Sequence, residues 1–230
     1  MAVDGDAADP AQEALTAARQ LAQEGKFEEA LAKHVWFHDH ALESSPSMYG
    51  VRLSFALGNW VDLGKKYPKA LAKLKAIRDE KTKLLLRGEG DNEIFHDVVA
   101  INRTLEETQA TVELFKKLDA GQPKRATQFF AYADDPLIGA GEFALAKKHL
   151  GDPMARFERA QEMLEHGLEY AKTSPIAERS RDVSQRMFVR DVVQLITVLT
   201  KTGDTEKARE IQAKALALFE SPDIKTAIPQ

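Results

Sequence analysis

The sequence predicts an all-α protein built from antiparallel helix pairs, and three observations support this. Apolar residues recur at spacings of three and four along most of the chain. Glycine or proline falls at the corners between these stretches, and no stretch alternates apolar and polar residues long enough to indicate a strand. The apolar stripes are also too wide for two helices to cover each other, so each pair needs neighbours on both sides.

Residues 49–74 show this pattern most clearly. Apolar side chains share one face of the first helix there, at Leu53, Leu57, Trp60 and Val61. Gly58 lies in the middle of that helix, where glycine costs about 1 kcal/mol relative to alanine, so we expect it to let another helix come close. A corner is expected at residues 64–66. Pro68 then opens the second helix, because its missing N–H is not needed in the first turn.

The composition is that of an ordinary globular protein. Of the 230 residues, 43% are hydrophobic and 30% are charged, and the net charge is −4. This acidic balance argues against a nucleic-acid partner. The absence of cysteine excludes disulfides, thiolate zinc sites and cysteine nucleophiles. No apolar run approaches the roughly 20 residues needed to span a bilayer, so we expect no membrane partner.

The N-terminal stretch, MAVDGDAADPAQ, has neither the basic start nor the apolar middle of a signal peptide. The expected location is therefore the cytoplasm. The alternative is an exported protein whose signal peptide is absent from this sequence.

We expect one helical-repeat domain over residues 11–220, flanked by a disordered tail at 1–10 and a second tail at 221–230. Helix pairs are expected near 11–46, 47–90, 91–122, 123–150 and 177–220, with an irregular helix over 152–174. This gives about eleven helices, counted from the apolar stripes and their breaks.

The corners of these pairs resemble one another. They read GKFEEAL at 25–31, KKYPKAL at 65–71, GEFALAK at 141–147 and GDTEKAR at 203–209. A helix pair that recurs every 34–45 residues or so is the signature of an α-solenoid.

The repeat residues themselves resemble the tetratricopeptide repeat in a degenerate form. Leu57-Gly58, Tyr67, Ala70 and Leu74 fall where that family places its leading-helix Leu-Gly, second-helix aromatic, small crossing residue and later apolar residue. The resemblance implies a right-handed α–α superhelix of antiparallel helix pairs. It also implies a scaffold that binds a peptide or partner protein along its concave face.

The residues just outside the packing stripes of the leading helices would line that concave face. They are Arg19, Gln23, Arg52, Asn59, Asp62, Asn92, Asn102, Arg103, Gln128 and Asp135. Arginine and amide side chains recognise carboxylates and peptide backbone through forked donors and paired donor–acceptor groups. Two other interpretations stay open: these residues form solvated helix faces, or Asp97, Asn102 and Arg103 form an internal polar network.

Three histidines within HVWFHDH raise the question of a metal site. His34 and His38 share a helix face, and a third ligand would have to be Asp39, Glu43 or His96. No HExxH motif is present. We favour His34 and His38 as partly buried packing residues, and we expect no metal and no cofactor. The alternative is a small-molecule-binding or metal-dependent protein, with or without enzymatic activity, that uses His34, His38, His96 and Asp97.

No enzyme motif stands out. The loop RGEGDN at 87–92 contains Gly-x-Gly but follows no strand, and no Gly-x-Ser-x-Gly elbow occurs. Asp134-Asp135-Pro136 is typical of a helix cap or kink. The sequence therefore predicts a non-catalytic interaction module, monomeric or a weak homodimer. A weaker hypothesis is a structural subunit that pairs through residues 178–219.

Overall fold

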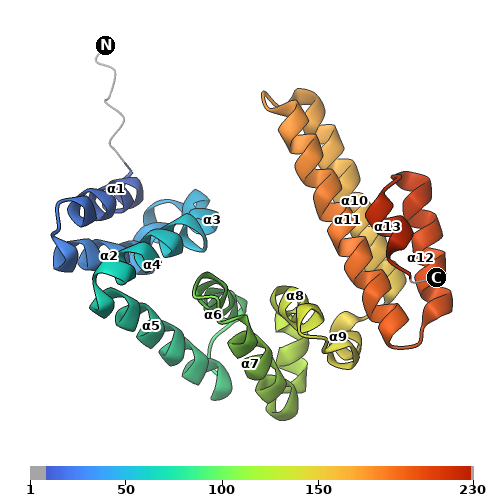
Figure 1. The fold of residues 1–230 in the computed structure, drawn as a ribbon, viewed down its shortest axis with the longest axis horizontal. Helices are drawn as coiled ribbons and strands as arrows, with labels where there is room; N and C mark the ends of the chain where they lie inside the picture. The colour runs from blue at the N-terminus through green and yellow to red at the C-terminus, as the bar shows by residue number, and fades with distance from the viewer. Residues whose placement is uncertain (1–8, 229–230) are drawn as a thin grey trace. The chain divides into compact units, whose positions relative to one another are not determined.

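The computed structural model describes residues 9–228, where helices are the only regular secondary structure. This confirms the predicted all-α class. These residues form thirteen α-helices and one short 3-10 helix, η1, and the helices pack mostly on their neighbours in sequence (Figure 1). The elements are α1 (Pro10–Gln23), α2 (Phe27–Ser44), η1 (Pro46–Met48), α3 (Tyr49–Arg52), α4 (Phe55–Lys66), α5 (Pro68–Leu86), α6 (Asn92–Thr104), α7 (Thr108–Gly121), α8 (Pro123–Gly139), α9 (Phe143–Leu150), α10 (Pro153–Thr173), α11 (Ala177–Lys201), α12 (Thr205–Leu218) and α13 (Pro222–Thr226).

Contacts between residues divide the chain into two compact units, where the sequence suggested a single domain. The first unit extends to Tyr132 and the second begins at Ala133, within α8. We call them the N-terminal and C-terminal units. The boundary falls inside a helix, so no loop or change in composition marks it in the sequence.

In the N-terminal unit each helix packs on the next. α1 packs on α2, α4 on α5, α5 on α6 and α6 on α7. The leading helices of successive pairs also touch: α1 contacts α4, and α4 contacts α6. The α8 part of this unit joins the series through a ring stack between Phe95 and Phe129, whose centroids are 4.8 Å apart.

Local sequence signals explain where several helices begin. Side chains of Asp9, Asp91 and Asp152 accept hydrogen bonds from the first-turn backbone of α1, α6 and α10, at 3.0, 3.0 and 2.9 Å. The corner glycine Gly25 has φ +78°, and Gly203 has φ +83°, which other residues rarely adopt. Residues 1–8 of the expected N-terminal tail lie outside the described residues.

The first helix of the 47–90 pair differs from the sequence expectation. We expected one helix, but the chain forms η1, α3 and α4, with a break at Leu53 and Ser54. The expected role of Gly58 is wrong, because a Cβ there would meet no atom within 4 Å. The close approach occurs instead at Gly64, whose added Cβ would lie 2.9 Å from the Leu71 Cβ. Gly64 is part of α4, and the corner follows at Tyr67.

Trp60 lies at the centre of the core that joins α2, α4, α5 and α6. Its side chain is 1% exposed, and its indole N–H donates to the Ala70 carbonyl at 2.9 Å. The surrounding core is made of Ala30, Leu31, Leu53, Leu57, Leu63, Leu74, Ala100 and Ile101. Because the indole is buried and its single N–H donor is paired with a carbonyl of α5, Trp60 fixes the distance between α4 and α5.

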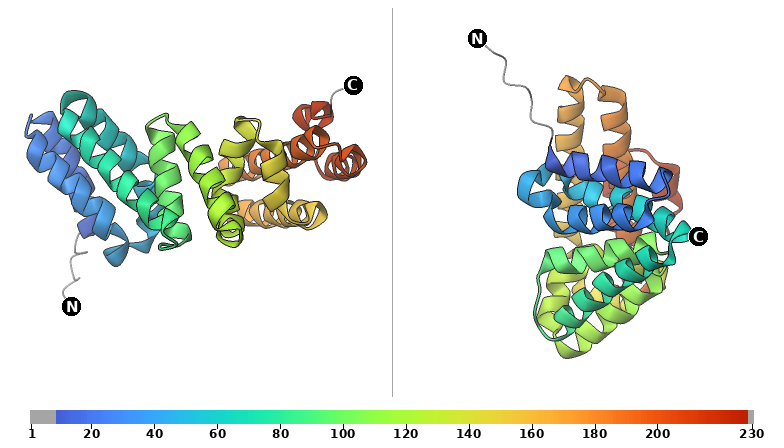
Figure 2. Two further views of the ribbon diagram at one scale, coloured as in Figure 1. Left: turned by 90° about the horizontal axis from the view of Figure 1, so that it is seen from below. Right: turned by 90° about the vertical axis from the view of Figure 1, so that its left-hand side faces the viewer.

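In the C-terminal unit, α11 contacts α9, α10, α12 and α13. The segment expected as an irregular helix forms the continuous helix α10, which lies side by side with α11 (Figures 1 and 2). Residues 222–226, expected as part of a tail, form α13, whose Ile224 is fully buried. Ile224 and two hydrogen bonds from Gln212 to the Ile224 and Lys225 carbonyls, at 2.8 and 3.1 Å, dock this turn, and the sequence pattern is too short to show it. Within residues 9–228, none of the helices is both long and apolar enough to cross a bilayer.

Candidate functional site

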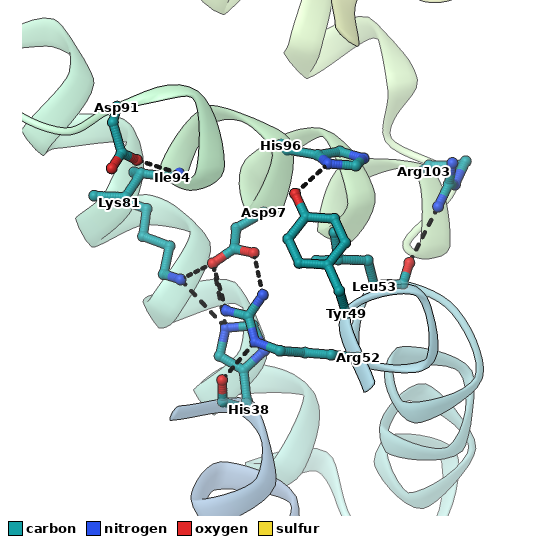
Figure 3. A network of polar contacts seen from close by, with 10 residues as sticks. All are labelled: His38, Tyr49, Arg52, Leu53, Lys81, Asp91, Ile94, His96, Asp97 and Arg103. Carbon is teal, nitrogen blue, oxygen red and sulfur yellow. Dashed lines mark hydrogen bonds and ion pairs between the residues drawn. The ribbon is translucent and has the colours of Figure 1, made fainter. Parts of the chain in front are cut away.

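A buried polar network in the N-terminal unit is centred on Asp97 of α6. Arg52 donates through Nη1 and Nη2 to the two carboxylate oxygens of Asp97, at 2.6 and 2.7 Å (Figure 3). Lys81 of α5 also donates to this carboxylate. Arg52 is 9% exposed and Asp97 is 3% exposed. Two cations therefore face one carboxylate in a place that water hardly reaches.

The network connects four helices. The Nε atom of Arg52, at the end of α3, donates to the His38 carbonyl of α2 at 2.7 Å. The His38 ring lies close by, with Nε2 3.4 Å from the Lys81 ammonium and 3.8 Å from the Asp97 carboxylate. The α2, α3, α5 and α6 segments are thus held in one register by charged hydrogen bonds, the kind that is geometrically most demanding.

Burial and neighbouring charge set the protonation states. Burial raises the pKa of Asp97, but the hydrogen bonds from Arg52 and the charge of Lys81 outweigh it, so the net pKa is lowered. Burial, followed by the charges of Arg52 and Lys81, lowers the pKa of His38 to about 3. At neutral pH the network therefore holds an ionised carboxylate, two cations and a neutral imidazole.

His34 is also buried and neutral. It is 2% exposed and stacks on Trp60 at a centroid distance of 5.6 Å. Burial, followed by the charge of Arg19, lowers its pKa to about 4. Its Nδ1 and that of His38 have no hydrogen-bond partner among the described residues. Within residues 9–228, no group of three or more histidine, aspartate or glutamate side chains is placed to hold a metal ion.

Next to the buried network, His96 of α6 joins two tyrosines at the surface. The Tyr49 hydroxyl lies 2.9 Å from His96 Nδ1 (Figure 3). On its other side the His96 ring stacks on Tyr132 of α8, with centroids 4.3 Å apart and planes 22° from parallel. All three side chains are half-buried. Burial lowers the pKa of His96 and raises that of Tyr49.

Most of the residues predicted for the concave face lie at the surface of the N-terminal unit. Arg19, Gln23, Asp62, Arg103 and Gln128 are exposed, and Asn59 is half-buried. Residues spaced three, four or seven positions apart lie on one side of a helix, so these residues form stripes on the outward faces of their helices. On α6, Asn92, His96 and Arg103 recur at spacings of four and seven, and on α8, Gln128 and Tyr132 are four apart. The His96–Tyr132 stack brings these two stripes together.

Two predicted groove residues point inward instead. Arg52 belongs to the buried network around Asp97. Asn102 is 1% exposed, donates to the Thr111 hydroxyl at 3.1 Å and accepts from Arg78 at 3.3 Å. The break between α3 and α4 rotates Arg52 off the α4 stripe, and Asn102 lies on the α6 face turned towards α7. Neither side chain is available to a ligand.

Three further predicted positions have hydrogen-bond or ion-pair partners within the chain. Asp135 belongs to the C-terminal unit, where it accepts a hydrogen bond from Gln194. Arg103 is exposed but also donates to the Leu53 carbonyl at 3.1 Å, which is one of the unpaired carbonyls at the end of α3 (Figure 3). Asp62 forms an exposed ion pair with Lys65 at 2.6 Å.

Sequence reasoning missed Tyr49, Lys81 and Tyr132. Aromatic residues within apolar stripes usually belong to the core, as Phe95 and Phe129 do, but the two tyrosines are half-buried. A signal was available for Tyr132, because it follows Gln128 by four residues on the same helix face. Nothing in the local sequence connects Lys81 with Asp97.

Comparison of this chain with protein families, curated proteins and solved structures finds no match.

Proposed function

We propose that this chain is a non-catalytic, tetratricopeptide-like helical-repeat protein that binds a peptide or a segment of a partner protein. In this proposal the helix pairs of the N-terminal unit form a right-handed superhelix. The ligand lies across the outward stripes of α4, α6 and α8, which we call the stripe surface: Asn59, Asn92, His96, Arg103, Gln128 and Tyr132.

The observation that carries the proposal is the stack of His96 on Tyr132. It makes the stripes of two successive leading helices one continuous surface, which an isolated solvated helix face would not be. The surface combines half-buried aromatic rings with exposed amide and guanidinium groups. Amides pair with peptide backbone, guanidinium pairs with carboxylates, and rings provide apolar contact area at low entropic cost.

The buried network supports the same function through rigidity. Arg52, Lys81 and Asp97 lie directly beneath His96 and Tyr49 and fix the helices that carry them. A surface whose backbone is already fixed loses little conformational entropy when a ligand binds. Of the residues that the sequence offered for a small-molecule or metal site, Asp97 is engaged by Arg52 and Lys81 in these helix contacts.

The proposal can be tested by selecting binders from a random peptide library on the immobilised full-length chain. Affinities of the selected peptides are then measured for the wild type, Tyr132→Ala and Gln128→Arg. We expect each variant to lose about tenfold or more in affinity, since an anchor contact is worth about 1.4 kcal/mol or more. Gln109→Arg, at an exposed glutamine of α7, is the matched control and should bind like the wild type.

Two results would contradict the proposal. One is a selection that enriches no peptide. The other is a set of peptides whose affinity is the same for the Tyr132 and Gln128 variants as for the Gln109 control. Circular dichroism on each variant separates loss of the stripe surface from loss of the fold.

A further inference from the structure

The pair of helices α10 and α11 exposes an unusual amount of apolar surface. Met163 and Tyr170 of α10 are 64% and 63% exposed, and Met187 and Val183 of α11 are 44% and 39% exposed. Single exposed apolar residues need no explanation, but four of them within one helix pair indicate an interaction surface. We call these four residues the hairpin patch.

The helix positions of the hairpin patch show that its members lie on one side of the pair. Each member comes one position before a residue that faces the other helix of the pair. These facing residues are Leu164, Ala171 and Phe188, which are buried, and Ser184, which lies at the close crossing of α10 and α11. One step back rotates a side chain by about 100° on both helices, and in an antiparallel pair the two rotations lead to the same side.

The level of each residue along the pair follows from the helix crossing. Gly167 and Ser184 cross so closely that a Cβ on Gly167 would lie 2.7 Å from the Ser184 Cβ. Counting from this crossing in opposite directions places Met163 beside Met187, and Tyr170 near the level of Val183. The four side chains therefore form a continuous patch and not four separate exposures.

Charges beside the hairpin patch differ between the two helices. On α10 the outer edge carries Glu162 and Glu169 together with Arg159 and His166, and on α11 it carries Arg179, Arg186 and Arg190 together with Asp182, all of them exposed. Glu169 also pairs with Lys172 at 2.5 Å, and Arg190 pairs with Asp191 at 2.8 Å within the same chain. Neither Glu162 nor Arg179 has an ion-pair partner within residues 9–228. Arg186 hydrogen-bonds the Asp182 carbonyl of its own helix. Glutamates therefore outnumber arginines on the α10 edge, and arginines outnumber aspartates on the α11 edge.

We propose that the hairpin patch is the contact surface of a homodimer, in which a second copy of this chain packs its own α10 and α11 against it. A two-fold axis parallel to the helices places α10 of one copy on α11 of the other and forms an antiparallel four-helix arrangement. Counted from the Gly167–Ser184 crossing, Glu162 then meets Arg190 of the second copy. Glu169 meets Arg179 and Arg186 of the second copy.

The charge pattern selects a second copy over another partner. An isologous contact requires one surface to complement itself, so it must carry both charges on opposite edges around an apolar centre. The hairpin patch has this arrangement. A partner of a single charge would leave one edge opposed to a like charge, which is unfavourable.

The first test is the molar mass of the full chain by sedimentation equilibrium, over a concentration range from about 1 μM to about 500 μM. We expect a reversible monomer–dimer equilibrium. Met163→Glu combined with Met187→Glu should raise the dissociation constant by about tenfold or more, because it places charges in the apolar centre. Phe55→Glu, which changes a 74% exposed side chain of the N-terminal unit, is the control and should leave the equilibrium unchanged.

The second test exchanges the edge charges. One variant carries Glu162→Arg and Glu169→Arg, and the other carries Arg179→Glu and Arg186→Glu. Each alone should dimerise about tenfold more weakly than the wild type, and an equimolar mixture should form a heterodimer of higher affinity than either homodimer. A strict monomer at all concentrations would overturn the proposal. So would a dimer that ignores the methionine substitutions, or a mixture that binds no better than its components.

Discussion

The Asp97 network of the N-terminal unit and the hairpin patch of the C-terminal unit depart from ordinary globular packing in opposite directions. Asp97 is 3% exposed although it is charged, whereas Tyr170 is 63% exposed although it is aromatic. Buried charge and exposed apolar surface are the two observations that carry information about a protein, since the reverse arrangement is the default. In the first region the departure holds helices together. In the second it leaves a surface for another molecule.

The physical cost of the two departures differs as well. A buried ion pair contributes little to net stability because desolvation offsets its attraction, but removing one partner leaves an uncompensated charge. An exposed apolar side chain costs the folded monomer nothing of this kind, and its free energy is gained only on association. Mutations in the two regions should therefore be read out by different measurements, stability in the first and molar mass in the second.

The largest expected effect is the loss of the central carboxylate. Asp97→Ala leaves the buried Arg52 and the half-buried Lys81 without their shared partner and should reduce the free energy of unfolding by about 3–5 kcal/mol. Urea unfolding followed by circular dichroism measures this. Glu80→Ala of α5, which removes an exposed pair with Lys83, is the matched control and should unfold at the wild-type midpoint. Equal stability of the two variants would show that the network does not hold the N-terminal unit together.

A smaller effect is expected from pH. In the unfolded chain His34 has its ordinary pKa near 6.5, while in the folded protein the pKa is about 4. The unfolded state therefore binds a proton first as the pH falls, and stability decreases between pH 6.5 and pH 4. At pH 5 this group alone accounts for a loss of about 2 kcal/mol relative to pH 7.

His34→Phe keeps a ring against Trp60 and removes one proton site, so it should reduce the pH dependence of unfolding between pH 6.5 and pH 4 by the share of this group. His38, whose pKa is about 3, contributes over the same window and keeps the remainder. The contribution of Asp97, whose pKa is lowered from 3.8, is lost only below that window. His166→Phe, at an exposed position of α10, is the control and should keep the wild-type slope. A wild-type slope in the His34 variant would be incompatible with a buried neutral imidazole.

The smallest expected change in stability is that of Gly58→Ala, which we compare with a glycine substitution in the C-terminal unit. Gly58→Ala should stabilise the protein by about 0.5–1 kcal/mol, because alanine favours helix and no atom lies within 4 Å of the added Cβ. Gly167→Ala should destabilise it by about 1–3 kcal/mol, because the new Cβ meets the Ser184 side chain at the crossing of α10 and α11. Thermal unfolding of both variants gives the signs. Stabilisation by both would contradict the close helix crossing on which the level of the hairpin patch depends.

The helix pattern was readable from sequence because it depends on neighbours in the chain. The apolar spacing along residues 177–220 predicted the last helix pair, which forms α11 and α12, and Gly25 and Gly203 marked corners because only glycine adopts their φ readily. The apolar pattern did not predict the structure of two short segments. The break at Leu53 and the docking of Ile224 each depend on contacts with residues elsewhere in the chain.

The candidate site shows the same division at the level of side chains. His96 and Asp97 are adjacent in sequence and were singled out together, yet one is half-buried beside two tyrosines and the other is buried between two cations. Exposure along a helix changes within 100° of rotation, so an outward position and an inward one can be consecutive residues. Asn102 was placed on the wrong side for this reason, and Arg52 because the break between α3 and α4 rotates it off the α4 stripe.

The sequence by itself determined the all-α class, most helix boundaries and the set of polar residues that follow the leading helices. Periodicity, caps and corner glycines are local properties, set by residues a few positions apart. The tertiary structure alone decided that Lys81 reaches Asp97, that Tyr132 covers His96 and that the hairpin patch is left uncovered. These pairings join residues 16 or more positions apart, and only the packing of whole helices brings such residues within a few ångströms.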